Sequence, residues 1–205
     1  MTTPAVLDDA VQFLIHHAPT SLGITRVMKL VFLADVEHMH LYGEPLSDLN
    51  WTWYNYGPFS PAVYGAVESL SEQGHIQDIP LNDGRRSVLP ATNNDRAIER
   101  PLPPRTERAL TRVLERFGSL PLPALKQAAY DTETMRASAP GQRLDLSHER
   151  QRTLVGAVPG LAALFARSPA PGGEEQGDPE ASAAEDRAIL DEFAKLRREA
   201  NRDPR

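Results

Sequence analysis

Apolar residues recur at helical spacing through the first part of the chain. Within Pro4–His17 they form one stripe, which predicts an amphipathic helix with a single buried face. Within Thr25–Tyr42 they occupy almost every side, and a helix without a polar face belongs in the centre of a core. Thr25 is expected to cap this second helix, and Gly43 to end it in a left-handed turn. The pattern therefore predicts a central helix with an amphipathic helix packed against it.

Short extended segments and a third helix follow. Leu49–Tyr54 alternates and contains two tryptophans, as is typical of a strand. The next residues, Tyr56-Gly57-Pro58, predict a rigid turn, in which Gly57 adopts a conformation that a Cβ would penalise. Pro58 sets the angle at which the following helix starts. That helix, Ser60–Gly74, has Ser60 as its N-cap and a proline at its first position.

Two strands around an Asn-Asp-Gly turn predict a hairpin at Ile76–Pro80 and Arg85–Pro90. Pro80 and Pro90 cannot donate to a ladder, so both strands are expected at sheet edges. Helical segments continue after a polar connection; they are 106–118, 123–130, 132–138, 147–155 and 159–167. The fold class is therefore mainly α with a small β-sheet or hairpin (α+β).

The chain of 205 residues divides into one domain and a tail. The domain is expected to span residues 1–167. Residues 168–184 are rich in Pro, Gly, Ala and acidic residues, which predicts a disordered linker. Residues 185–201 are expected to form a short amphipathic helix whose apolar side includes Phe193 and Leu196. Because a helix of this length has only marginal stability alone, we expect it to dock on a partner, on a second copy of the chain or on its own domain.

The composition excludes several classes of function but does not identify one. The chain has no cysteine, no apolar run long enough to span a bilayer and no readable signal peptide, which favours a cytoplasmic protein without a membrane partner. His16 and His17 are adjacent, and His38 and His40 are two apart, so neither pair has the spacing that directs two imidazoles at one metal ion. His38 and His40, with Asp35 and Glu37, are expected to form a solvated last turn of the central helix. We predict no catalytic group, no metal site and no cofactor, and hence no enzyme.

Charge is unevenly distributed along the chain. Residues 1–90 carry four basic and ten acidic residues, whereas residues 91–168 carry twelve basic and eight acidic ones. A helix followed by a hairpin over residues 60–90 is the element order of a winged helix, a DNA-binding module. Its DNA contacts would come from Ser60, Tyr64, Arg85 and Arg86. The 60–74 helix, however, has no Lys or Arg and carries two glutamates, and phosphate contacts supply most DNA affinity.

Aromatic residues are concentrated in one short stretch. Six of them fall between residues 51 and 64. Trp51 and Trp53 are expected to fill the core, yet an alternating strand cannot bury every ring on one face. Tyr and Trp are also enriched where proteins anchor one another. The residues predicted to bind a partner are Trp53, Tyr54, Tyr56, Phe59 and Tyr64, together with Phe193 and Leu196 of the terminal helix.

A set of short motifs resembles the Panacea domain, the SocA-like antitoxin domain of bacteria and their phages. They are Lys29-Leu30, Ala34, His40-Leu41-Tyr42-Gly43, Pro45-Leu46, Tyr56-Gly57-Pro58 and Val63-Tyr64. Weaker similarity extends through Leu114–Arg136, where Tyr130 stands at a position often occupied by histidine in the family. The resemblance makes Lys29, Tyr42, Gly43, Gly57 and Pro58 the structural motif. It implies a mostly helical domain that binds and neutralises a toxin encoded beside it.

Two functions remain after these arguments. The leading hypothesis is an antitoxin that neutralises its cognate toxin by direct binding. The alternative is a winged-helix regulator of transcription, and both roles could reside in one autoregulatory protein. Whether the chain forms a homodimer is left open.

Overall fold

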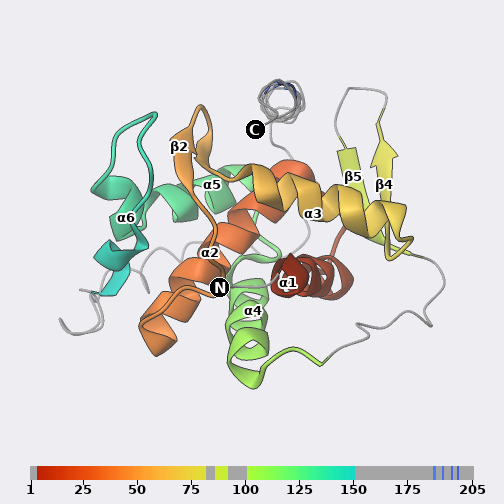
Figure 1. Cartoon of the computed structure of the whole chain (residues 1–205), viewed down its shortest axis with the longest axis horizontal. Helices are drawn as coiled ribbons and strands as arrows, with labels where there is room; N and C mark the ends of the chain where they lie inside the picture. Colours follow the sequence, from red (N-terminus) through yellow and green to blue (C-terminus); the bar gives the residue numbers. More distant parts are fainter. Residues whose placement is uncertain are drawn as a thin grey trace, which may run out of the picture.

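The computed structural model describes residues 4–81, 86–91 and 101–150, together with Arg187, Asp191, Lys195 and Arg198. It confirms the predicted class, a mainly helical fold with small antiparallel sheets (Figure 1). The elements are α1 (Pro4–His17), β1 (Leu22–Gly23), α2 (Ile24–Tyr42), β2 (Thr52–Tyr54), β3 (Gly57–Phe59), α3 (Pro61–Glu72), β4 (Ile76–Pro80), β5 (Arg86–Pro90), α4 (Pro104–Phe117), α5 (Leu122–Tyr130), α6 (Glu133–Arg136) and the 3₁₀ helix η1 (Leu146–Arg150). No described helix is long and apolar enough to cross a membrane.

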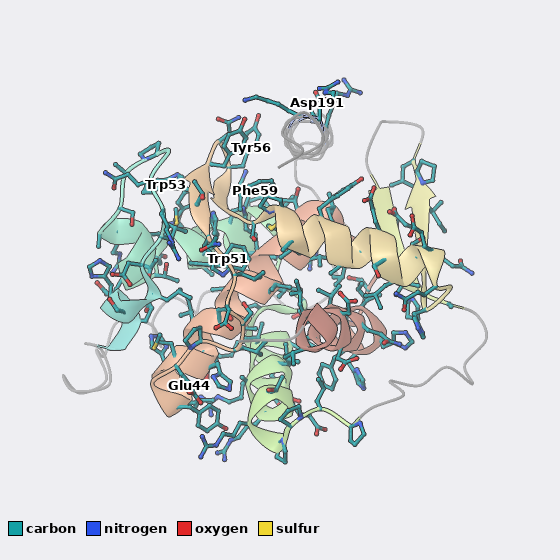
Figure 2. The ribbon with its side chains drawn as sticks, in the orientation of Figure 1. Glu44, Trp51, Trp53, Tyr56, Phe59 and Asp191 are labelled. Atoms are coloured by element: carbon teal, nitrogen blue, oxygen red, sulfur yellow. The ribbon has the colours of Figure 1, made fainter. Side chains whose placement is uncertain are left out.

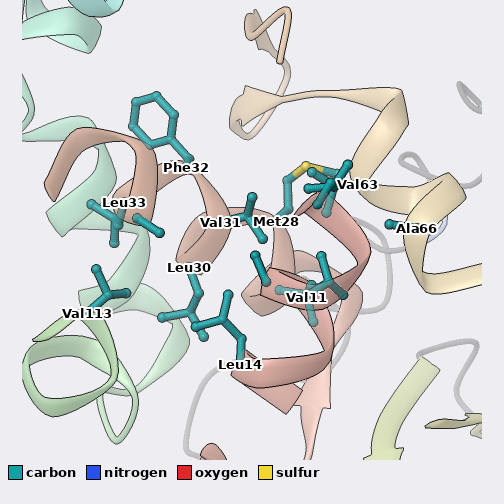
Figure 3. Close-up of a cluster of buried hydrophobic side chains, with 14 of the residues drawn as sticks. Val11, Leu14, Met28, Leu30, Val31, Phe32, Leu33, Val63, Ala66 and Val113 are labelled. Atoms are coloured by element: carbon teal, nitrogen blue, oxygen red, sulfur yellow. The ribbon is translucent and has the colours of Figure 1, made fainter. Parts of the chain in front are cut away.

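Helix α2 is the centre of the core, as its apolar pattern predicted. Every position from Ile24 to Met39 is buried, and α1, α3, α4 and α5 all contact this helix. Figure 3 shows Leu14 of α1 beside Leu30, and Met28 reaching towards Val63 of α3. Removing apolar surface from water along the whole helix is the main force that holds these elements together.

The two ends of α2 differ in how well they match the prediction. Gly43 has φ of 75°, and its N–H donates to the carbonyl of Met39, so the left-handed end is confirmed. The predicted cap at Thr25 is wrong. The helix begins one residue earlier, after Gly23 in an extended conformation, and no side chain caps it. Thr25 is buried inside the first turn instead.

The larger sheet has the order β1-β5-β4, all antiparallel. The strand that ends at Pro90 is therefore central, and its prediction as an edge strand is wrong. Strand β1 is only two residues long and pairs with Ser87 and Val88, so Pro90 never has to donate an N–H to it. The predicted Asn-Asp-Gly turn lies outside the described residues.

Strands β2 and β3 form a second, smaller antiparallel sheet. Trp53 pairs with Pro58, and Tyr54 with Gly57. The turn consists of Asn55 and Tyr56, so the predicted turn over Tyr56-Gly57-Pro58 is wrong for its last two residues. Proline is tolerated in β3 because, among the described residues, only β2 pairs with this strand, and its other side has no ladder there.

Parts of the predicted C-terminal region lie outside the described residues. These are the helices beyond residue 150, the linker 168–184, and Phe193 and Leu196. Within the range 185–201, the four described positions are helical and exposed. Arg187, Asp191, Lys195 and Arg198 are spaced four, four and three apart, which places them on one side of that helix.

Candidate functional site

Polar residues of α2 connect the core to segments far away in the sequence. Arg26 donates from its two terminal nitrogens to the carbonyls of Leu120 and Gly118, at 2.8 and 3.0 Å. Lys29, only 2% exposed, donates from Nζ to the carbonyl of Pro58 at 3.1 Å. These bonds satisfy backbone carbonyls that would otherwise be buried without a donor. They fix the loop between α4 and α5 and the strand β3 against the central helix.

Asp35 occupies a fully buried pocket of donors. Its carboxylate accepts from the backbone N–H and the hydroxyl of Ser47, both at 2.7 Å, and from Nε1 of Trp51 at 2.6 Å. Burial raises the pKa of Asp35 to about 6, although the bonds from Ser47 and Trp51 act in the opposite direction. The contacts hold the segment between α2 and β2 and place Trp51 edge-on to Phe32.

The prediction of a solvated last turn of α2 is wrong. Asp35, Glu37 and His38 are all buried. Glu37 accepts from Arg112 and Arg116 of α4, and His38 Nδ1 bonds to the carbonyl of Glu44 at 2.8 Å. Each polar group finds a partner from another segment, which offsets the cost of removing it from water.

His40 contacts a glutamate more than one hundred residues further along the chain. Its Nε2 lies 2.8 Å from Oε2 of Glu149, whose other oxygen accepts the backbone N–H of Thr134. Burial raises the pKa of Glu149, but the hydrogen bonds from His40 and Thr134 outweigh it, and the pKa falls below its usual value. Among the described residues, no group of three or more His, Asp or Glu side chains could hold a metal ion.

The residues of the motif around Gly57 meet at one point of the fold. Gly57 has φ of 102°, which side-chain-bearing residues rarely adopt. A methyl group at this position would lie 3.4 Å from Lys29 Nζ and 3.4 Å from Cζ of the Tyr130 ring. Gly57 thus allows β3, α2 and α5 to approach one another closely.

Half-buried aromatic side chains cover this junction on the outside. Trp53 and Tyr130 have ring centroids 5.9 Å apart, and the Lys126 ammonium lies 5.6 Å above the Tyr56 ring. Tyr54 is also half-buried and packs against Phe59. We call Trp53, Tyr54, Tyr56, Lys126 and Tyr130 the aromatic hairpin surface. Figure 2 shows Trp53 and Tyr56 on the β2–β3 hairpin, with Trp51 lying deeper in the molecule.

The residues predicted to bind a partner divide into two groups within the described part of the chain, outside which Phe193 and Leu196 lie. Trp53, Tyr54 and Tyr56 lie on the aromatic hairpin surface. Phe59 and Tyr64 are 6% and 4% exposed and belong to the core cluster, so the structure assigns them a packing role rather than the predicted surface role. The reason is that β3 and the first turn of α3 pack directly on α2.

The residues predicted to contact DNA are not brought together as an exposed surface. Ser60 and Tyr64 are buried, Arg86 begins β5, and Arg85 lies outside the described residues. Helix α3 does precede the β4–β5 hairpin, but a winged helix is not confirmed. The outer face of α3 carries Glu68 and Glu72, which would repel phosphates.

Sequence reasoning missed two members of the aromatic hairpin surface. Lys126 and Tyr130 lie one turn apart on α5, and nothing near them in the sequence indicates a contact with a hairpin some seventy residues earlier. The one signal was the weak family similarity, which placed Tyr130 at a distinctive position. Tyr42 of the motif lies elsewhere, where its ring contacts the tilted ring of His38 and the guanidinium of Arg105.

The chain folds into a helical domain around a central helix whose buried polar side chains bond to other segments, and half-buried aromatic rings lie on its surface. The family model of the antitoxin SocA-like Panacea domain matches residues 27–134. This is just over half of the chain and includes most of α2, the β2–β3 and β4–β5 hairpins, α4 and α5. The chain therefore belongs to the SocA-like Panacea family, as its motifs suggested. No curated protein and no solved structure gives a significant match.

Proposed function

We propose that the protein is an antitoxin that neutralises a co-encoded toxin by binding it through the aromatic hairpin surface. Membership of the SocA-like Panacea family supports the antitoxin role. The observation that carries the choice of surface is the pairing of half-buried rings across the hairpin and α5, where Trp53 contacts Tyr130 and Tyr56 contacts Lys126.

Half-buried rings suit this role energetically. Trp and Tyr supply a large contact area at a small cost in side-chain entropy, and they dominate the energy of many interfaces. The rings here are already oriented, because Trp53 contacts Tyr130 and Lys29 fixes the neighbouring strand. Pre-orientation lowers the entropy lost when a partner docks.

The proposal describes a binding protein of the cytoplasm rather than an enzyme, and it requires no cofactor. Neutralisation follows from occupying the toxin, so the antitoxin needs no reactive group of its own. The same chain could occupy its own promoter, but the acidic outer face of α3 argues against the winged-helix alternative.

The first experiment tests the role. The reading frame adjacent to the gene is expressed alone and together with this protein. Growth arrest in the first case and growth in the second are expected, together with co-purification of the two proteins. A neighbouring product that is harmless alone would contradict the antitoxin role.

The second experiment tests the surface. Replacing Trp53 and Tyr56 by Ala should weaken toxin binding by about 2 kcal/mol, roughly 30-fold in Kd. Leu89→Ala is the control, because Leu89 is also half-buried but lies on β5 of the other sheet. Equal Kd values for both variants, each with the wild-type circular dichroism spectrum, would remove the surface from the proposal. Light scattering on the same samples measures self-association.

A further inference from the structure

Helix α4 carries four arginines along one flank. Arg105, Arg108, Arg112 and Arg116 are spaced three, four and four apart. At about 100° per residue they fall within an arc of about 80° and extend over about 16 Å of the helix axis. We call this row the arginine flank. It borders the buried face of α4, which packs on α1 and α2, so it follows the seam between α4 and the end of α2.

Three of the four guanidinium groups are held in position by neighbouring groups. Arg112 and Arg116 both donate to Glu37, whose side chain is only 6% exposed. Arg116 also lies 4.9 Å above the Phe117 ring, and Arg105 lies 5.2 Å above the ring of Tyr42. A buried carboxylate and two rings therefore fix side chains that would otherwise lose much entropy on binding.

The guanidinium groups of the arginine flank also keep N–H donors that face solvent. The side chains of Arg105, Arg112 and Arg116 are 68, 44 and 39% exposed. Arg112 bonds to Glu37 through Nε, which leaves the two terminal nitrogens of a fork that has five N–H groups. Arg108 is exposed and has no polar partner within the part of the chain that the structure describes. Such forks match the geometry of carboxylates and phosphates.

We propose that the arginine flank is a second binding surface, which takes a carboxylate-rich segment of a partner protein. Two observations favour carboxylates over the phosphates of a nucleic acid. The flank already binds carboxylates within the chain, since Arg112 and Arg116 bind Glu37 and Arg105 lies 3.9 Å from a carboxylate oxygen of Glu44. In addition, arginines four apart are separated by about 6 Å along the axis, close to the spacing of about 6.7 Å between alternate residues of an extended peptide.

This surface is separate from the aromatic hairpin surface. In Figure 2, Glu44, which borders the arginine flank, is labelled in the lower part of the view, whereas Tyr56 of the hairpin is labelled near its upper edge. A variant of α4 therefore tests this inference without altering the hairpin, and its failure would leave the proposed function untouched.

The test measures the affinity of the full chain for labelled probes by fluorescence anisotropy at low salt. The probes are a twelve-residue peptide of alternating Glu and Ser, the matching Gln and Ser peptide, and a duplex DNA of similar length. Binding of the Glu peptide alone is expected. Replacing Arg108 and Arg112 by Gln should weaken it by about tenfold. Arg136→Gln is the control, since Arg136 is an exposed arginine on α6 with acidic neighbours of its own.

The Glu37→Gln variant tests whether peptide binding depends on the fixed positions of the arginines or on the net charge of the protein alone. It makes the protein more positive, yet it removes the buried group that holds two of the arginines, so the Glu peptide should bind more weakly. If this variant loses its fold, Arg112→Lys replaces it, because that change keeps the charge and removes the fork. Tighter or unchanged binding in the variant used would overturn the inference. So would equal Kd values in the double variant and the Arg136→Gln control, or DNA that binds more tightly than the peptide through the same arginines.

Discussion

Replacement of Gly57 by Val tests the junction of β3, α2 and α5 most directly. The perturbation has two parts. The first is conformational, because a φ of 102° disfavours any residue with a Cβ, and a branched one most. The second is steric. The Cβ itself would make ordinary contacts with Lys29 Nζ and the Tyr130 ring at 3.4 Å, so the two further methyl groups of Val would have to displace one of them.

The magnitude follows from these two parts. The left-handed conformation costs about 1–2 kcal/mol in a residue with a side chain. Forcing extra methyl groups into packed surroundings costs about 1–3 kcal/mol. Gly57→Val should therefore lower the free energy of unfolding by about 2–5 kcal/mol, which most domains of this size survive.

The assay is urea unfolding followed by circular dichroism, with Gly141→Val as the matched control. Gly141 also has a positive φ, of 84°, but no atom lies within 4 Å of the place where its Cβ would be. The control thus contains the conformational cost without the steric one, and it should be destabilised by less. Equal losses at both positions would refute the close approach at Gly57. A Gly57→Val variant with wild-type stability that fails to bind a partner would show that Gly57 acts as a contact.

Three further predictions concern buried acids and the tail. The pKa of Asp35 is about 6 in the folded protein and 3.8 ordinarily. The contribution of its protonated form to the free energy of unfolding is therefore complete below pH 4, and about 3 kcal/mol of it is lost as the pH rises to 6. The difference in unfolding free energy between wild type and Asp35→Asn should vary over that range. The contribution of Glu149 to stability depends on pH in the opposite direction, since its pKa is lowered from 4.5. Glu149→Gln should therefore cost about 1–3 kcal/mol at pH 7 and less as the pH falls below 4.5, and a loss independent of pH would contradict this. Deleting Pro169–Arg205 should leave the circular dichroism of the domain intact, because α1 to η1 all precede it; aggregation would show that the tail belongs to the core.

The sequence predicts the helices of this fold well because their signals are local. The stripe of α1 and the continuous apolar surface of α2 depend only on residues within a few turns. Gly43 and Trp51 were also placed correctly, one by the conformational freedom of glycine and the other by its size. None of these inferences requires knowledge of residues later in the chain.

The polar contacts of α2 could not be predicted in the same way. Charged residues near a helix end normally lie in water, and only partners on other segments reverse that expectation for Asp35, Glu37 and His38. Those partners include Arg112 and Arg116, about 75 residues away. The aromatic hairpin surface has the same origin, because Tyr130 joins Trp53 only through the folded arrangement of α5.

The bond between His40 and Glu149 has a consequence for synthesis on the ribosome. The two residues are 109 positions apart, so at roughly 5–20 residues per second about 5–20 s pass between their translation. At the start of that interval the apolar sides and buried charges of α2 exist without α4 and α5 to cover them, and η1 is made only at its end. A chaperone that binds exposed apolar helices would meet this nascent chain before the last contacts of its central helix can form.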